Sequence, residues 1–214
     1  MTTTPGKPVT KPAEFTGTAR LPVSPNGEVG STVILWADDH SGYLTIGAGV
    51  VARDTFGMPI DTVSIVAVPV ATIPTPGQIG PLDQPAALYA YNCTPEGVTF
   101  SPAITLTFTL SEEEWNRYGN QAEVGWFNST SGGEWEVFAG VPDPPGERTI
   151  TIPISHFSTY ALFAEAGPEV PPLPDMTKTS PGGSAEGSSL WLWSGLIIAI
   201  IGVGFLIIRR QKND

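Results

Sequence analysis

The sequence predicts an all-β fold, an antiparallel β-sandwich of about nine strands, followed by one C-terminal transmembrane α-helix. Three observations predict this. Apolar and polar residues alternate with period two in several short segments, which is typical of strands with one buried face. Turns rich in glycine and proline separate these segments. The nineteen residues Leu190–Ile208 carry no charge, and as a helix of about 29 Å they are long enough to cross a bilayer.

Composition excludes several classes of protein. The chain has 214 residues, 41% of them hydrophobic and 14% charged, and a net charge of −11. A disordered chain would contain fewer apolar residues. Its single cysteine excludes a disulfide framework within the chain and a four-cysteine zinc site. The acidic balance argues against a nucleic-acid partner, because phosphate binding needs a basic surface.

Period-two alternation marks the strands individually. In Ala103–Leu110, isoleucine, leucine and phenylalanine alternate with threonine, and Arg148–Ile154 repeats the pattern with three isoleucines. Ser131–Gly133 predicts a hairpin turn, and Asp54–Gly57 predicts another turn. Ser111 and Glu114 fit a capping box, so a short helix is expected over 111–118. The other expected strands are Ser31–Ala37, Tyr43–Ala52, Ile60–Val70, Ala87–Asn92, Ala122–Asn128, Glu134–Phe138 and Ser158–Ala164.

The ends of the apolar segment predict how it lies in the membrane. Tryptophans favour the headgroup level, and basic residues favour the cytoplasmic side. We therefore expect residues 209–214 inside the cell and the sandwich outside, with the lipid bilayer as a partner. A buried core helix is the alternative. The residues expected to form and bound the anchor are Leu190, Trp191, Trp193, Ile201, Ile208, Arg209 and Arg210.

The expected order of segments follows from composition. Residues 1–10 contain no apolar stretch of the kind that a signal peptide has. We expect that a true start precedes Met1; a tail-anchored protein with a cytoplasmic domain is the alternative. The expected segments are a disordered Thr/Pro-rich segment and lead-in (1–25), the sandwich (26–164), a Pro/Gly/Ser-rich stalk (165–189), the transmembrane helix (190–208) and a basic cytoplasmic tail (209–214).

A family resemblance rests on the stretch from Asn26 to Val68. An apolar strand there leads to a turn supplied by Gly49, Val50, Val51, Asp54, Gly57 and Pro59, and then to another strand. This pattern resembles a β-sandwich module of prokaryotic, especially archaeal, cell-surface proteins, which is similar to the sandwich of netrin receptors and ankyrins. Later strands resemble it as far as Ala164. The resemblance implies an extracellular architectural or interaction domain and brings no catalytic set.

A second resemblance is partial. Some surface proteins end in a sorting motif, an apolar span and a basic tail, which a sortase-type enzyme reads. Leu173–Thr177 only loosely matches such a motif. A retained anchor is therefore expected, with processing as the alternative.

Polar clusters give no catalytic, cofactor or metal site. Asp38-Asp39-His40 lacks the spaced oxygen ligands of a calcium loop and is expected to be a solvated turn. Glu112–Glu114 suits a helix N-terminus. His156 and Ser155 are neighbours on a strand and point to opposite faces, so they do not form a nucleophile–base pair. Cys93 is expected to be a buried apolar residue, with an interchain disulfide as the alternative.

Two kinds of surface chemistry are expected. Asn128 and Asn92 begin sequons for N-glycosylation, and Asn128 ranks higher because Pro95 directly follows the other sequon. Trp36, Trp115, Trp126 and Trp135 are expected to pack in the core, with a sugar-stacking platform as the alternative. Trp126 and Trp135 are expected to pair across the hairpin.

These features predict a membrane-anchored extracellular protein whose sandwich has a structural or adhesive role, and no enzyme activity. The alternatives are a module that binds glycans or other surface proteins, and a hydrolase that uses Asp38, Asp39 or His156. No cofactor is expected, and the oligomeric state is left open.

Overall fold

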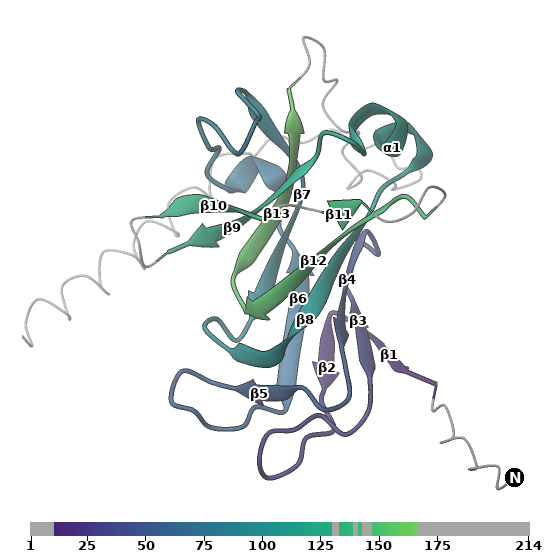
Figure 1. Cartoon of the computed structure of the whole chain (residues 1–214), viewed down its shortest axis with the longest axis vertical. Helices are drawn as coiled ribbons and strands as arrows, with labels where there is room; N and C mark the ends of the chain where they lie inside the picture. Colours follow the sequence, from purple (N-terminus) through teal and green to yellow (C-terminus); the bar gives the residue numbers. More distant parts are fainter. Residues whose placement is uncertain (1–10, 130–132, 139–140, 143–146, 167–214) are drawn as a thin grey trace, which may run out of the picture. The chain divides into compact units, whose positions relative to one another are not determined.

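The part of the chain that the structure describes forms two packed β-sheets, as the sequence predicts, and is mostly β with little helix. The computed structural model describes residues 11–129, 133–138, 141–142 and 147–166. Figure 1 shows the two layers, with the only α-helix of these residues at one end. Antiparallel pairs make up both sheets apart from β1 and β3, which pair in parallel.

Seven strands form the first sheet, in the order β1-β3-β4-β8-β12-β11, with β5 paired to β8. These strands are β1 (Ala13–Thr16), β3 (Val33–Trp36), β4 (Gly42–Ile46), β5 (Val51–Arg53), β8 (Thr99–Thr109), β11 (Val141–Pro142) and β12 (Thr149–His156).

Six strands form the second sheet, in the order β10-β9-β13-β7-β6-β2. These strands are β2 (Thr18–Arg20), β6 (Thr62–Ala67), β7 (Pro85–Thr94), β9 (Glu123–Asn128), β10 (Glu134–Phe138) and β13 (Thr159–Glu165). A 3-10 turn, η1 (Val70–Thr72), precedes β7, and the helix α1 (Glu112–Tyr118) follows β8.

The alternation in β8 and β12 creates the centre of the core. Ile104, Leu106 and Phe108 are buried between the sheets. The register places them opposite Ile154, Ile152 and Ile150, respectively, so two apolar rows face the same interior. Because the side chains of a strand alternate between its faces, the intervening threonines of β8 point to the outer face.

The sandwich differs from the sequence prediction in its starting residue and in one of its strands. Strands β1 and β2 lie within residues 1–25, which the composition predicts to be a disordered segment and lead-in, so the sandwich begins at Ala13 rather than at Asn26. The chain passes from one sheet to the other at Gly17, whose φ of 72° favours glycine. The strand predicted over Tyr43–Ala52 is in fact two strands, β4 and β5, separated by a turn in which Gly49 has φ 87°.

The helix begins as predicted. The Ser111 side chain accepts a hydrogen bond from the Glu114 backbone N–H, and the Glu114 carboxylate accepts one from the Ser111 N–H. This reciprocal pair satisfies two backbone donors that the first turn leaves free.

A second apolar cluster lies on the far side of the six-stranded sheet. Ile79 and Leu82, in the segment between η1 and β7, pack against Ala90, Ala161 and Phe163 of the two central strands. These strands are therefore buried on both faces, and Tyr160 to Ala164 are all buried. Alanines at the outer-face positions leave room for the covering segment.

A hydrogen bond within one corner fixes the turn between β12 and β13. The Tyr160 hydroxyl donates to the backbone carbonyl of His156 at 2.6 Å. A tyrosine near the start of a strand that bonds back to the preceding corner is typical of immunoglobulin-like sandwiches. Tyr160 is fully buried, so its hydroxyl needs this acceptor.

The expected membrane anchor, stalk and tail lie outside the described residues. Among the residues that the structure describes, no helix has the length and apolar character needed to cross a membrane. The expectation for Leu190–Ile208 therefore stays a prediction.

Candidate functional site

The acidic turn between β3 and β4 connects the two sheets. Asp38 accepts a hydrogen bond from the Ala67 N–H of β6 at 3.0 Å. Asp39 accepts one from the Tyr91 hydroxyl of β7 at 3.2 Å and one from the Ser41 N–H at 3.0 Å. Both carboxylates are thus engaged in holding the turn of one sheet against the strands of the other.

A second tyrosine–carboxylate pair lies nearby. The Tyr89 hydroxyl is 2.9 Å from each carboxylate oxygen of Glu114, which also caps the helix. Burial, followed by the hydrogen bond to Glu114 and then by the Glu114 charge, raises the pKa of Tyr89. Burial and the nearby Asp39 likewise raise the pKa of Tyr91. Both hydroxyls therefore stay protonated and donate hydrogen bonds.

The carboxylates described above do not form a set of metal ligands. Among the described residues, no three His, Cys, Asp or Glu side chains gather as ligands. His40 lies beside Trp36, with ring centroids 6.2 Å apart. Of the three glutamates that begin α1, Glu112 lies 3.7 Å from the Arg148 guanidinium and Glu114 caps the helix.

His156 packs as an aromatic residue. Its ring makes an edge contact with Trp126, with centroids 4.6 Å apart, and among the residues that the structure describes its buried Nε2 atom has no hydrogen-bond partner. Burial lowers the pKa of His156, and the Glu136 charge opposes that shift. The Ser158 hydroxyl is engaged elsewhere, because it donates to the Phe127 carbonyl at 2.7 Å.

Cys93 lies in the main core with none of its surface exposed. Burial raises the pKa of its thiol, which disfavours the reactive thiolate. A disulfide to another chain would require β7 to separate from its neighbours.

The four tryptophans lie in different environments. Trp115 and Trp126 pack against the main core, and Trp135 packs against the outer cluster, where its Nε1 donates to the Pro74 carbonyl at 2.8 Å. The predicted pairing of Trp126 with Trp135 is wrong. The hairpin register is offset by one residue, so Trp135 lies opposite Phe127, and neighbouring residues on a strand face opposite ways.

Of these four tryptophans, only Trp36 lies on the outer face of the seven-stranded sheet. Its ring lies 4.4 Å from that of Tyr43, tilted by 44°, and both residues are half-buried. The register continues from Tyr43 to Thr107, and from Thr45 to Thr105, on the neighbouring strand. The result is an aromatic pair beside the half-buried Thr45 and Thr105, whereas Thr107 is buried and its hydroxyl pairs with that of Thr151. Tyr43 could have been found from sequence only by knowing the β3–β4 register.

The two sequons lie on the six-stranded sheet. Asn92 is exposed on β7, whereas the Asn128 side-chain amide donates to Glu136 at 2.7 Å. Thr94 of the first sequon shares a hydrogen bond with Ser64. Thr130 of the second lies outside the described residues. Glycosylation at either asparagine stays a prediction.

Comparisons of the chain with family models, with curated proteins and with solved structures found no match.

Proposed function

We propose that the chain is a membrane-anchored extracellular surface protein whose β-sandwich has a structural or adhesive role. The observation that carries the proposal is the uncharged stretch Leu190–Ile208, with tryptophans at its first end and Arg209 and Arg210 directly after it. A stretch of that length matches the hydrocarbon thickness of a bilayer, and the arginines favour the cytoplasmic side.

The sequence between sandwich and anchor supports the proposal. Residues 165–189 contain five prolines followed by a Gly/Ser stretch. Proline stiffens a linker and glycine loosens it. At about 3.1 Å per residue, a fully extended linker would hold the sandwich at most ~75 Å from the membrane. Such spacing suits a domain that meets partners beyond the cell surface.

The chemistry of the sandwich supports a structural or binding role. The carboxylates of Asp38, Asp39 and Glu114 each accept hydrogen bonds that hold the fold. A hydrolase that uses Asp38 or Asp39 with His156 needs them in one pocket, and His156 instead contacts Trp126 and Tyr160.

The experiment that tests the proposal asks which side of the membrane the sandwich occupies. A membrane-impermeant reagent applied to intact cells should reach the sandwich and not the basic tail. A sandwich that becomes reachable only after permeabilisation would overturn the proposal.

The Trp36–Tyr43 pair favours a second candidate function, the binding of a neutral glycan. Sugar rings present apolar faces that stack on aromatic rings, and the half-buried Thr45 and Thr105 supply hydroxyls as hydrogen-bonding partners. The rings of Trp36 and Tyr43 and the hydroxyls of Thr45 and Thr105 carry no charge, which matches an uncharged polyhydroxylated ligand.

Replacing Trp36 tests glycan binding. Trp36→Ala should weaken retention on a neutral polysaccharide by roughly tenfold, the factor that corresponds to losing ~1.4 kcal/mol of contact. Trp36→Phe, which keeps an aromatic face, should retain much of the binding. Affinity electrophoresis of the full chain over a panel of neutral and acidic glycans measures the effect. Equal mobility of all three proteins on every glycan would contradict this function.

A further inference from the structure

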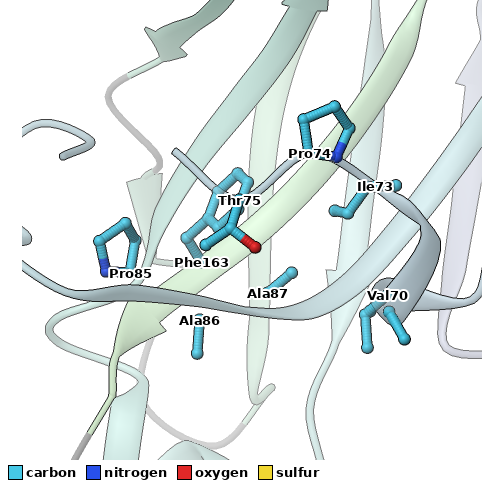
Figure 2. A pocket seen from close by; sticks show the side chains of 9 residues that line it. Val70, Ile73, Pro74, Thr75, Pro85, Ala86, Ala87 and Phe163 are labelled. Atoms are coloured by element: carbon cyan, nitrogen blue, oxygen red, sulfur yellow. The ribbon is translucent and has the colours of Figure 1, made fainter. Parts of the chain in front are cut away.

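The chain itself covers one part of the outer face of the six-stranded sheet. The segment between β6 and β7 packs there, and a Cβ atom at Gly125 would lie 2.6 Å from the Ile79 side chain. An apolar pocket lies between the segment that follows η1 and the start of β7, with Phe163 of β13 in its wall (Figure 2). This covered part of the face ends where the segment ends, and the outer face continues beyond it.

A row of side chains, one from each of five strands, crosses the face beside the covered part. The register brings these residues into line, and we call them the outer row: Val66, Asn92, Thr159, Phe127 and Trp135. Tyr160 faces the core, so its neighbour Thr159 faces outward. Val66 is 46% exposed and Asn92 is exposed, whereas the other three are half-buried. The outer row thus has an asparagine beside an exposed apolar side chain.

The Asn92 amide presents its nitrogen to solvent. Its Oδ1 atom lies 3.5 Å from the Thr159 hydroxyl, and within the described part of the chain its Nδ2 atom makes no side-chain hydrogen bond. Asn128 differs, because its Nδ2 atom donates to Glu136 at 2.7 Å. Since Phe127 belongs to the outer row, its neighbour Asn128 points to the other face of the sheet. A substituent on Nδ2 therefore displaces a contact at Asn128 and none of these contacts at Asn92.

Asn92, Cys93 and Thr94 form a complete sequon. Proline is excluded only at its middle position, and Pro95 lies beyond the triplet. In the folded sheet the Thr94 hydroxyl is bonded to Ser64, and β7 lies between β6 and β13. A transferase that reads the sequon therefore acts before β7 pairs with its neighbours. The exposed position of Asn92 reverses the order of the two sequons that Pro95 predicts.

We propose that Asn92 carries an N-linked glycan and that this glycan lies over the outer row. The inference rests on the proposed surface display, because this modification is typical of secreted chains. A glycosyltransferase and a lipid-phosphate-linked oligosaccharide supply the sugar. The Asn92 Nδ2 atom forms a bond to C1 of the first sugar and loses one proton. The bond from C1 to the carrier oxygen breaks, and the lipid phosphate leaves with its electron pair.

The neighbours of Asn92 suit an attached sugar chain. Adjacent strands lie about 4.8 Å apart, so Val66 and Thr159 flank the first sugar, and Phe127 lies two strand spacings away, about 10 Å. The rings of Phe127 and Trp135 have centroids 5.3 Å apart and offer stacking surfaces to later sugars. Covering Val66 removes apolar surface from water, which is favourable. The outer row thus has a specific occupant, attached at its own asparagine.

Mass measurement of the full chain, purified from the cells in which it occurs, tests the modification. Asn92→Gln should lose the mass of one glycan, and Thr94→Ala should lose the same mass because it destroys the sequon. Thr94→Ser, which keeps the hydroxyl, and Asn128→Gln should both retain that glycan. An unchanged mass for Asn92→Gln, or a glycan lost only with Asn128→Gln, would overturn the proposal.

Cysteine labelling tests where the glycan lies. Val66→Cys is made in the glycosylated chain and in the Asn92→Gln chain, and both are treated with a bulky maleimide in detergent micelles. The glycosylated chain should react several-fold more slowly at residue 66. Gln121→Cys, an exposed control position, should react equally in both backgrounds, and the native Cys93 is buried. Equal rates at residue 66 would overturn the placement over the outer row.

One comparison separates this inference from surface display. An absent glycan at Asn92, in a chain whose Gln121→Cys variant an impermeant maleimide labels on intact cells, would overturn the glycan proposal alone. An absent glycan in a chain that is labelled only after permeabilisation would overturn both proposals. A glycan found at Asn92 supports both.

Discussion

Phe108→Ala should lower the free energy of unfolding by about 3–5 kcal/mol, the range for removing a buried phenyl ring from a packed core. Phe108 is completely buried in β8, opposite Ile150, and its ring lies 5.5 Å from that of Tyr91. Domains of this size are stable by only about 5–15 kcal/mol. The substitution therefore removes a large share of the stability, which denaturant unfolding of the full chain in micelles measures.

Phe56→Ala provides the matched control, since it makes the same chemical change at an 89% exposed position. Surface substitutions of this kind usually change stability by less than about 0.5 kcal/mol. Two variants with equal losses would contradict the placement of Phe108 between the sheets and of Phe56 in solvent.

Ile201→Arg should release the chain from membranes. Ile201 lies near the middle of the uncharged stretch, and an arginine at mid-span costs about 2.5–3.5 kcal/mol on insertion scales. That cost corresponds to a fall of roughly a hundredfold in the membrane-bound to unbound ratio. Fractionation of cell lysates into membrane and supernatant measures the ratio.

Two controls accompany that substitution. Ile201→Leu keeps the stretch apolar and should remain in the membrane fraction. Gln211→Arg adds the same charge among the basic residues beyond the stretch and should also remain. If Ile201→Arg fractionates as the unmodified chain does, Leu190–Ile208 is not a membrane span.

Sequence was sufficient where local chemistry decides structure. The period-two pattern of β8 and β12 identified the buried rows, because each strand carries its own inward and outward faces. The capping box at Ser111 and the turn at Asp54 were also predictable, since their hydrogen bonds join residues at most four apart.

Sequence was insufficient where distant segments meet. The pairing of β1 with β3 and of β2 with β6 was missed, because three- and four-residue strands carry too short a pattern to recognise. The predicted pairing of Trp126 with Trp135 is wrong because the strand register is offset by one residue, which places Trp135 opposite Phe127. The pocket and the Trp36–Tyr43 pair depend on which segments pack together, which no local pattern shows.

The side of the membrane that the sandwich occupies is tested most directly by labelling two matched variants, Gln121→Cys on the sandwich and Gln211→Cys in the basic tail. The native thiol of Cys93 is buried and stays silent in the folded chain. On intact cells an impermeant maleimide should label Gln121→Cys at once, and Gln211→Cys only after permeabilisation. The reverse pattern would place the sandwich inside the cell and contradict surface display.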